Sequence, residues 1–170
     1  MALYLITGVS GTGKSTACAE LRERGYTAYD GDTDHLAHWF NNETGAIEYY
    51  DGTVAFIETH QRSVARETVK RLAQEARDKP VFLCNDPANE DELLDLFAQV
   101  FALVVDDDTR NYRLANRKSG HYDWGKLPHE MAYTRTEKAL AYERYKRPQY
   151  STIDATQPTA AIVDQILAHL

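Results

Sequence analysis

The chain contains few cysteines and no long apolar run. Its two cysteines, Cys18 and Cys84, lie far apart and lack the spacing of a metal site. This usage is typical of a reduced, intracellular protein. The first apolar stretch, "ALYLI", is too short for the core of a signal peptide or for a membrane span. We therefore expect a soluble, cytoplasmic protein with no membrane partner.

The chain also lacks an excess of positive charge. It carries 19 basic and 26 acidic residues, for a formal net charge of -7. This balance argues against a nucleic-acid partner, which usually requires a basic stripe, but it allows a small anion in a local basic pocket. The length of 170 residues, 43% of them hydrophobic, predicts a single domain over residues 1–170 with a sizeable core. The sequence leaves the oligomeric state open.

Strand-like and helix-like segments alternate along the sequence. The strand-like segments are residues 2–7, 26–30, 81–84, 100–105 and 151–155. The helix-like segments are residues 13–25, 33–40, 58–78, 89–97, 107–117, 129–146 and 158–170. This alternation predicts an α/β fold in which helices cover both faces of a parallel sheet.

The sequence "GVSGTGKST" at residues 8–16 has the spacing G-x-x-x-x-G-K-[ST] and lies between the first strand and the first helix. Successive backbone N–H groups of such a loop form a nest for phosphate oxygens, and the positive end of the helix adds to it. Lys14 is expected to reach the β and γ phosphates, and Ser15 to offer its hydroxyl to Mg²⁺. A glycine-rich turn without a ligand is the alternative, which the full consensus disfavours. The candidate nucleotide contacts here are Gly8, Ser10, Gly11, Thr12, Gly13, Lys14, Ser15 and Thr16.

Three aspartates follow the second predicted strand at alternate positions, namely Asp30, Asp32 and Asp34. The carboxyl ends of parallel strands face the ligand crevice, so these residues and the glycine-rich loop share one edge of the sheet. A carboxylate there can orient or deprotonate an acceptor hydroxyl, or hold water on Mg²⁺. The alternative is a solvated turn in which one aspartate caps the next helix. Position favours Asp32 as the catalytic group and water-mediated metal ligand, with Asp30 and Asp34 as further substrate contacts.

"GVSGTGKST" together with "DGD" at residues 30–32 resembles the P-loop small-molecule kinases, which include gluconate, adenylylsulfate, shikimate and nucleoside monophosphate kinases. The resemblance continues at "VVDDDTRNYRLANR" and at "IDATQP". It implies a three-layer P-loop NTPase fold with a five-stranded parallel sheet, a small lid, and ATP with Mg²⁺ as the donor. It also implies a base-contacting loop at Asp154, Ala155 and Thr156.

The same resemblance allows two alignments of these aspartates with the motifs of the family. "DGD" matches the gluconate and adenylylsulfate kinases, whereas "DTD" at residues 32–34 matches the shikimate kinases. Both alignments give Asp32 the acceptor hydroxyl, but they assign different roles to Asp34.

Basic residues recur at intervals of four in the predicted helix over residues 58–78. Arg62, Arg66 and Lys70 would share one face of that helix. The resemblance implies that an arginine here holds an anionic acceptor, and Arg62 is the candidate because it lies nearest the helix start. A solvated basic face is an equal alternative for the row as a whole.

Two further acidic sites follow strands. Asp86 is a candidate Mg²⁺ or water-positioning group, or else a turn residue before Pro87. Asp107 or Asp108 is expected to cap the helix that follows the fourth strand, rather than to act in catalysis.

Arg113 and Arg117 precede a polar, glycine-containing loop, residues 118–128, that we interpret as the lid. A lid arginine can neutralise the charge that develops during phosphoryl transfer while the lid excludes water. Arg117 adjoins the loop and is the catalytic candidate, whereas Arg113 is expected to contact the base or a phosphate. An exposed helix face is the alternative for either arginine.

The sequence favours an enzyme that moves the γ-phosphate of ATP to a hydroxyl or phosphate of a small-molecule acceptor. A P-loop ATPase that acts as a regulatory switch is the alternative, although a switch needs no acceptor site. A polynucleotide 5′-kinase is a third possibility that the net charge disfavours.

Overall fold

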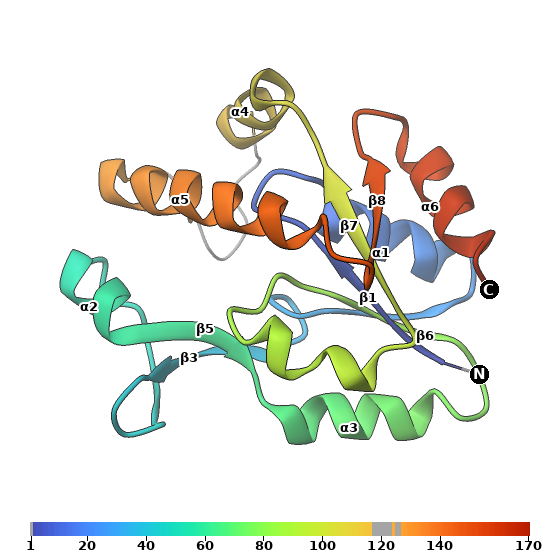
Figure 1. Cartoon of the computed structure of the whole chain (residues 1–170), viewed down its shortest axis with the longest axis horizontal. Helices are drawn as coiled ribbons and strands as arrows, with labels where there is room; N and C mark the ends of the chain where they lie inside the picture. Colours follow the sequence, from blue (N-terminus) through green and yellow to red (C-terminus); the bar gives the residue numbers. More distant parts are fainter. Residues whose placement is uncertain (1, 117–123, 125–126) are drawn as a thin grey trace.

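A computed structural model describes residues 2–116, 124 and 127–170 (Figure 1). Five parallel strands form the main sheet in the order β2-β6-β1-β7-β8. These strands are β1 (Leu3–Thr7), β2 (Thr27–Asp30), β6 (Val81–Cys84), β7 (Gln99–Val104) and β8 (Tyr150–Asp154). The predicted five-stranded parallel sheet is therefore confirmed.

Helices cover both faces of this sheet. The α-helices are α1 (Lys14–Glu23), α2 (Val54–Thr59), α3 (Arg66–Glu75), α4 (Asp107–Ala115), α5 (Pro128–Arg144) and α6 (Thr159–Leu167). Side chains of β1 alternate between the faces, so Tyr4 and Ile6 pack with α1 and α6, whereas Leu3 and Leu5 pack with α3 and α5. None of the described helices has the length and apolar character needed to span a bilayer.

A second sheet of three antiparallel strands stands beside the first, and the sequence did not predict it. It has the order β4-β3-β5, formed by β3 (Ala37–Asn41), β4 (Ile47–Glu48) and β5 (His60–Val64). The predicted helix over residues 33–40 is thus wrong, and the one over 58–78 begins only at Arg66. Pairing between distant segments decides this region, because the polar sequence of β5 carries no clear strand pattern of its own.

The helix predicted over residues 89–97 is also wrong. The chain forms two short 3₁₀ turns there, Glu90–Glu92 and Leu94–Leu96. Asn89 does not cap them, since its side-chain amide exchanges hydrogen bonds with the backbone N–H and carbonyl of Val64. This pair of bonds ties β5 to the segment that follows β6.

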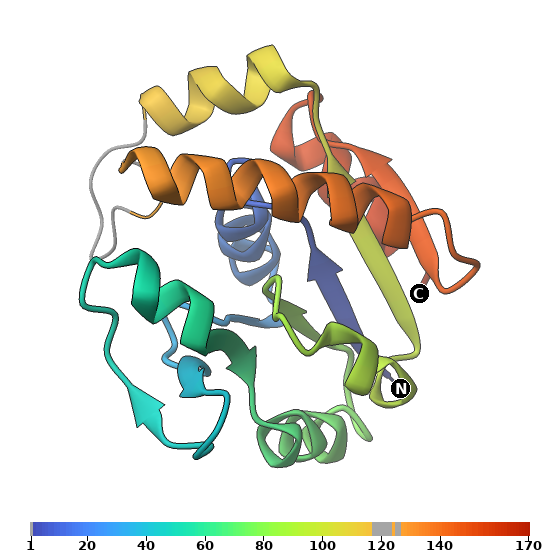
Figure 2. The same cartoon turned by 60° about the vertical axis from the view of Figure 1, so that its left-hand side comes forward.

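Figure 2 shows α2 beside the N-terminal end of α5, so the small sheet and α5 approach each other at one end of the molecule. A hydrogen bond of 3.1 Å between Tyr50 and His129 joins the two parts there. The N-cap of α4 is Asp106, whose carboxylate accepts from the N–H of Thr109, rather than the predicted Asp107 or Asp108.

Candidate nucleotide and acceptor sites

The loop between β1 and α1 has a backbone that glycine alone adopts without strain. Gly8, Gly11 and Gly13 have φ angles of 149°, 91° and 101°. A Cβ at Gly8 would lie 2.7 Å from Thr12 Oγ1 and 2.8 Å from the carbonyl oxygen of Leu103. The glycines therefore allow the tight curl that the phosphate-binding loop requires.

Lys14 lies across this loop. Its ammonium group donates to the carbonyl oxygen of Gly8 and, over 3.4 Å, to that of Val9. Ser15 and Thr16 are exposed in the first turn of α1, and no described side chain caps that turn. The first N–H groups of α1 and the Ser15 hydroxyl thus face solvent where a polyphosphate would bind.

Two arginines of α4 hold the loop from outside. Arg113 donates to the carbonyl oxygens of Thr12 (3.2 Å) and Ala155 (2.8 Å), which joins the loop to the segment after β8. Arg110 Nε donates over 3.0 Å to the carbonyl oxygen of Ser10. Arg110 is only 3% exposed, and burial lowers the pKa of its guanidinium.

The structure therefore places Arg113 and residues 154–156 beside the phosphate-binding loop. Asp154 accepts from the N–H and the hydroxyl of Thr156, so it shapes the turn that follows β8. Sequence reasoning missed Arg110, which only the helical spacing from Arg113 would have linked to this site. Arg117 and most of the proposed lid over residues 118–128 lie outside the described residues.

Asp30 and Asp34 hold the turn that follows β2. Asp30 is 4% exposed and accepts from the N–H groups of Asp32 and Thr33. Asp34 accepts from the N–H of Asp30 and pairs with Arg22 of α1. Both carboxylates thus have structural partners, but neither caps a helix, because this turn leads into β3.

Asp32 instead forms an ion pair with Arg62, so the structure brings two of the predicted site residues together. Arg62 Nε and Nη2 lie 3.1 and 2.6 Å from Asp32 Oδ1. Arg62 belongs to β5 and not to a helix, and its carbonyl oxygen accepts from the N–H of Ala88. The predicted row of three on one helical face does not form, because only Arg66 and Lys70 lie on α3, where they pair with Asp95 and Glu67.

A buried ionic network lies beneath Asp86. Glu90 is fully buried and accepts from the hydroxyls of Thr7 and Tyr150, each over 2.6 Å. Arg144 of α5 lies 3.3 Å from Glu90 and 3.4 Å from Asp86. Burial is the main reason that the pKa of Glu90 is raised. This network connects the last residue of β1, directly before the phosphate-binding loop, to α5.

Glu137 and Tyr133 of α5 complete the group around Asp86. Burial, reinforced by the charge of Asp86, raises the pKa of Glu137. Burial and the charges of Glu137 and Asp86 raise the pKa of Tyr133 to about 12. Several perturbed groups at one edge of a parallel sheet indicate a functional site. Sequence reasoning missed Glu90, Arg144, Glu137 and Tyr133, because only the fold brings α5 to Asp86.

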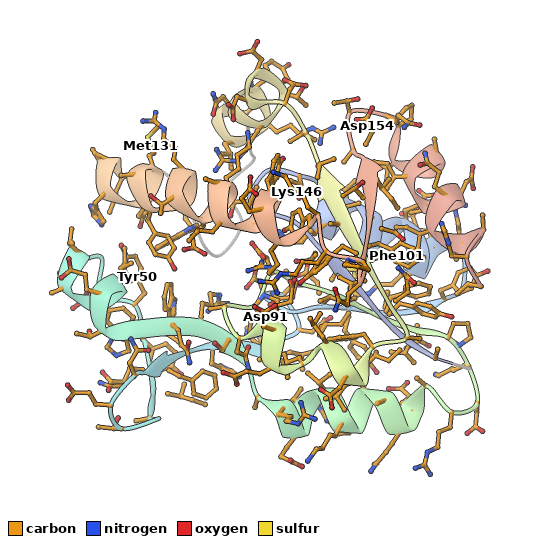
Figure 3. All side chains as sticks on the ribbon, viewed as in Figure 1. Tyr50, Asp91, Phe101, Met131, Lys146 and Asp154 are labelled. Carbon is orange, nitrogen blue, oxygen red and sulfur yellow. The ribbon has the colours of Figure 1, made fainter. Side chains whose placement is uncertain are left out.

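Replacing Glu90 by alanine should destabilise the protein by about 3 kcal/mol or more, since Arg144 and two hydroxyls would lose a buried partner. Urea unfolding followed by circular dichroism measures the loss. Asp91→Ala is the matched control, because the neighbouring Asp91 carboxylate (Asp91 is labelled in Figure 3) is half-exposed and pairs with Arg147. Equal midpoints for the two variants would contradict a stabilising role for the network.

Known proteins show the same architecture. A family model described as an AAA domain matches residues 5–156. A search of curated proteins finds no match.

Solved structures with this fold include several kinases. Shikimate kinase from Bacteroides thetaiotaomicron is 17% identical with a TM-score of 0.62, covering 99% of this chain and 98% of that one. A gluconokinase from Sinorhizobium meliloti 1021 is 21% identical with a TM-score of 0.56, covering 97% and 89%. Deoxyadenosine kinase from M. mycoides with bound dCTP is 15% identical with a TM-score of 0.58, covering 98% and 97%. At these identities the likeness establishes the fold.

Proposed function

The chain belongs to the AAA domain family, and we propose that it is an ATP-dependent phosphotransferase that acts on a small-molecule acceptor. The pairing of Asp32 with Arg62 carries the proposal, because the arginine orients a carboxylate that follows β2, at the sheet edge where the phosphate-binding loop follows β1. The similar folds of shikimate kinase, gluconokinase and deoxyadenosine kinase support it.

On the donor side, the loop from Gly8 to Thr16 binds the phosphates of ATP. The N–H groups and Lys14 neutralise the negative charge of the β and γ phosphates. Arg110 and Arg113 act on the loop through its carbonyl oxygens and fix the direction of its N–H groups. Residues 154–156 contact the base, next to the bond from Arg113 to Ala155.

The residues present fit a magnesium ion bound with the nucleotide. The described part of the chain holds no group of three or more histidine, cysteine, aspartate or glutamate side chains that could bind a metal alone. Mg²⁺ in kinases is instead held by substrate phosphates, water and one or two protein oxygens. The exposed Ser15 hydroxyl would supply one such oxygen, and Asp32 and Asp86 would act through water. The ion would contribute neutralisation of phosphate charge.

On the acceptor side, Asp32 orients the hydroxyl and takes its proton. The acceptor oxygen forms a bond to the γ-phosphorus, the bond to the β,γ-bridging oxygen breaks, and ADP leaves with that electron pair. Arg62 fixes the Asp32 carboxylate and contacts the acceptor, as Asp30 and Asp34 would in the alternative alignments. Arg117 is proposed to stabilise the developing charge from the lid, and the protein to act in the cytoplasm.

Release of ADP in the presence of added compounds tests the proposal. A phosphotransferase should form ADP slowly from ATP and Mg²⁺ alone, and at least tenfold faster with an acceptor that becomes phosphorylated. Phosphate transfer to the compound is confirmed by mass spectrometry. ADP formation that is equally fast without any acceptor would identify the alternative, an ATPase switch.

A further inference from the structure

Aromatic side chains gather next to the Asp32–Arg62 pair. Trp39 of β3 is the direct strand partner of Arg62, so their side chains share one face of the small sheet. Trp39 stacks on Tyr50, with ring centroids 5.8 Å apart, and its centroid lies 5.6 Å from that of Trp124. Figure 3 shows Tyr50 on the side of β5 that faces α5. We call Trp39, Tyr50, Phe56, Trp124 and Tyr133 the aromatic cluster.

The cluster reaches both parts of the acceptor site. The ring centroids of Tyr133 and Trp124 are 5.8 Å apart. Besides burial, the nearby charges of Glu137 and Asp86 raise the pKa of the Tyr133 hydroxyl. Trp39 adjoins Arg62 at the other end. The acceptor groups are thus bordered by aromatic rings, of which Tyr50, Trp124 and Tyr133 are only partly buried and could stack on a planar ring.

Trp39 also has an unused hydrogen-bond donor. Its side chain is 5% exposed, and Nε1 has no hydrogen-bond partner among the described residues. Native proteins seldom leave a buried donor unpaired, because the lost hydration is costly. A ligand that stacks on the cluster and offers a ring nitrogen or carbonyl oxygen would satisfy this donor.

The charges at the site disfavour an anionic acceptor. Arg62 is paired with Asp32, and Arg144 lies near both Asp86 and Glu90. A carboxylate or phosphate on the acceptor would therefore meet at least as many acidic as basic groups.

We propose that the acceptor is an uncharged nucleoside, whose base stacks on the aromatic cluster and accepts from Trp39 Nε1 while a sugar hydroxyl lies at Asp32. This inference rests on the proposed phosphotransferase function and specifies its substrate class. Both halves of a nucleoside match the site, since the planar base suits the aromatic faces and the sugar hydroxyls suit the carboxylates.

Rates of ADP release with a panel of acceptors test the inference. The panel comprises ribonucleosides and 2′-deoxyribonucleosides of all bases, together with gluconate and shikimate as acids without an aromatic ring. At least one nucleoside should raise the rate tenfold or more, and neither acid should do so. If no nucleoside raises the rate, the inference is overturned. In that case, acceleration by gluconate or shikimate would still support the proposed phosphotransferase function. ADP release that is equally fast without any acceptor would contradict both the nucleoside acceptor and the phosphotransferase function.

Variants of Trp39 separate recognition from folding. Trp39→Phe keeps an aromatic ring but removes the donor, and should raise KM for the nucleoside about tenfold with KM for ATP unchanged. Trp39→Leu also removes the aromatic ring that holds Tyr50 and Trp124 in place, and should raise the nucleoside KM about a hundredfold. Tyr26→Leu is the control, because Tyr26 packs edge-on against Phe82 on the opposite face of the main sheet. An unchanged nucleoside KM in folded Trp39→Phe and Trp39→Leu would overturn the inference.

Discussion

Replacing Lys14 by alanine is expected to lower the rate of phosphoryl transfer about a thousandfold or more, because the β and γ phosphates lose their nearest fixed positive charge. The fold should remain intact, since the bonds of the Lys14 ammonium to described residues go to two carbonyl oxygens of its own loop. Steady-state ADP formation and thermal unfolding measure the two effects.

Lys146→Ala is the control for the loss of one positive charge. Lys146 is exposed just after the end of α5 and, within the described part of the chain, pairs with Glu143 three residues earlier. Its removal should leave the rate near that of the unmodified protein. A Lys14→Ala variant as active as this control would refute the assignment of residues 8–16 to phosphate binding.

Replacing Asp32 by asparagine should lower kcat about a hundredfold while KM for ATP changes little. The substitution keeps the size of the side chain and removes the group that takes the acceptor proton, a contribution that usually amounts to two or more powers of ten. Product formation with a saturating acceptor gives kcat, and titration of ATP gives its KM.

Asp95→Asn shows what the loss of an aspartate–arginine pair does away from the site. Asp95 pairs with Arg66 at the surface, as Asp32 pairs with Arg62. Full activity is expected in Asp95→Asn. Equal activity in both variants would mean that Asp32 serves only the turn and the ion pair.

The main sheet and the donor site follow from local sequence. Apolar runs specify the central strands. The spacing from Gly8 to Ser15 identifies the loop from local sequence alone, without knowledge of its tertiary contacts. The acceptor side depends on contacts between distant segments. Sequence reasoning includes Arg62 in a helix over residues 58–78, yet pairing with Trp39 makes its segment a strand.

Glu90 shows a second reason why part of the site escaped prediction. A glutamate among acidic neighbours in "NEDE" looks like a solvated residue, and its sequence alone favours exposure. Only the approach of Thr7, Arg144 and Tyr150 makes its burial tolerable. These partners come from β1, α5 and β8, so no local pattern contains the information.

The small β4-β3-β5 sheet has a consequence for how enzymes of this architecture diversify. One continuous segment between β2 and α3 forms this sheet, and none of its strands pairs with a strand of the main sheet. Under the proposed function, mutations in residues 37–64 can therefore change which acceptor binds while the residues proposed to bind ATP stay unaltered. The glycine-rich loop, α4 and β8 lie outside this segment. Substrate choice can thus change through one segment of the protein while the phosphate-binding segments keep their sequence.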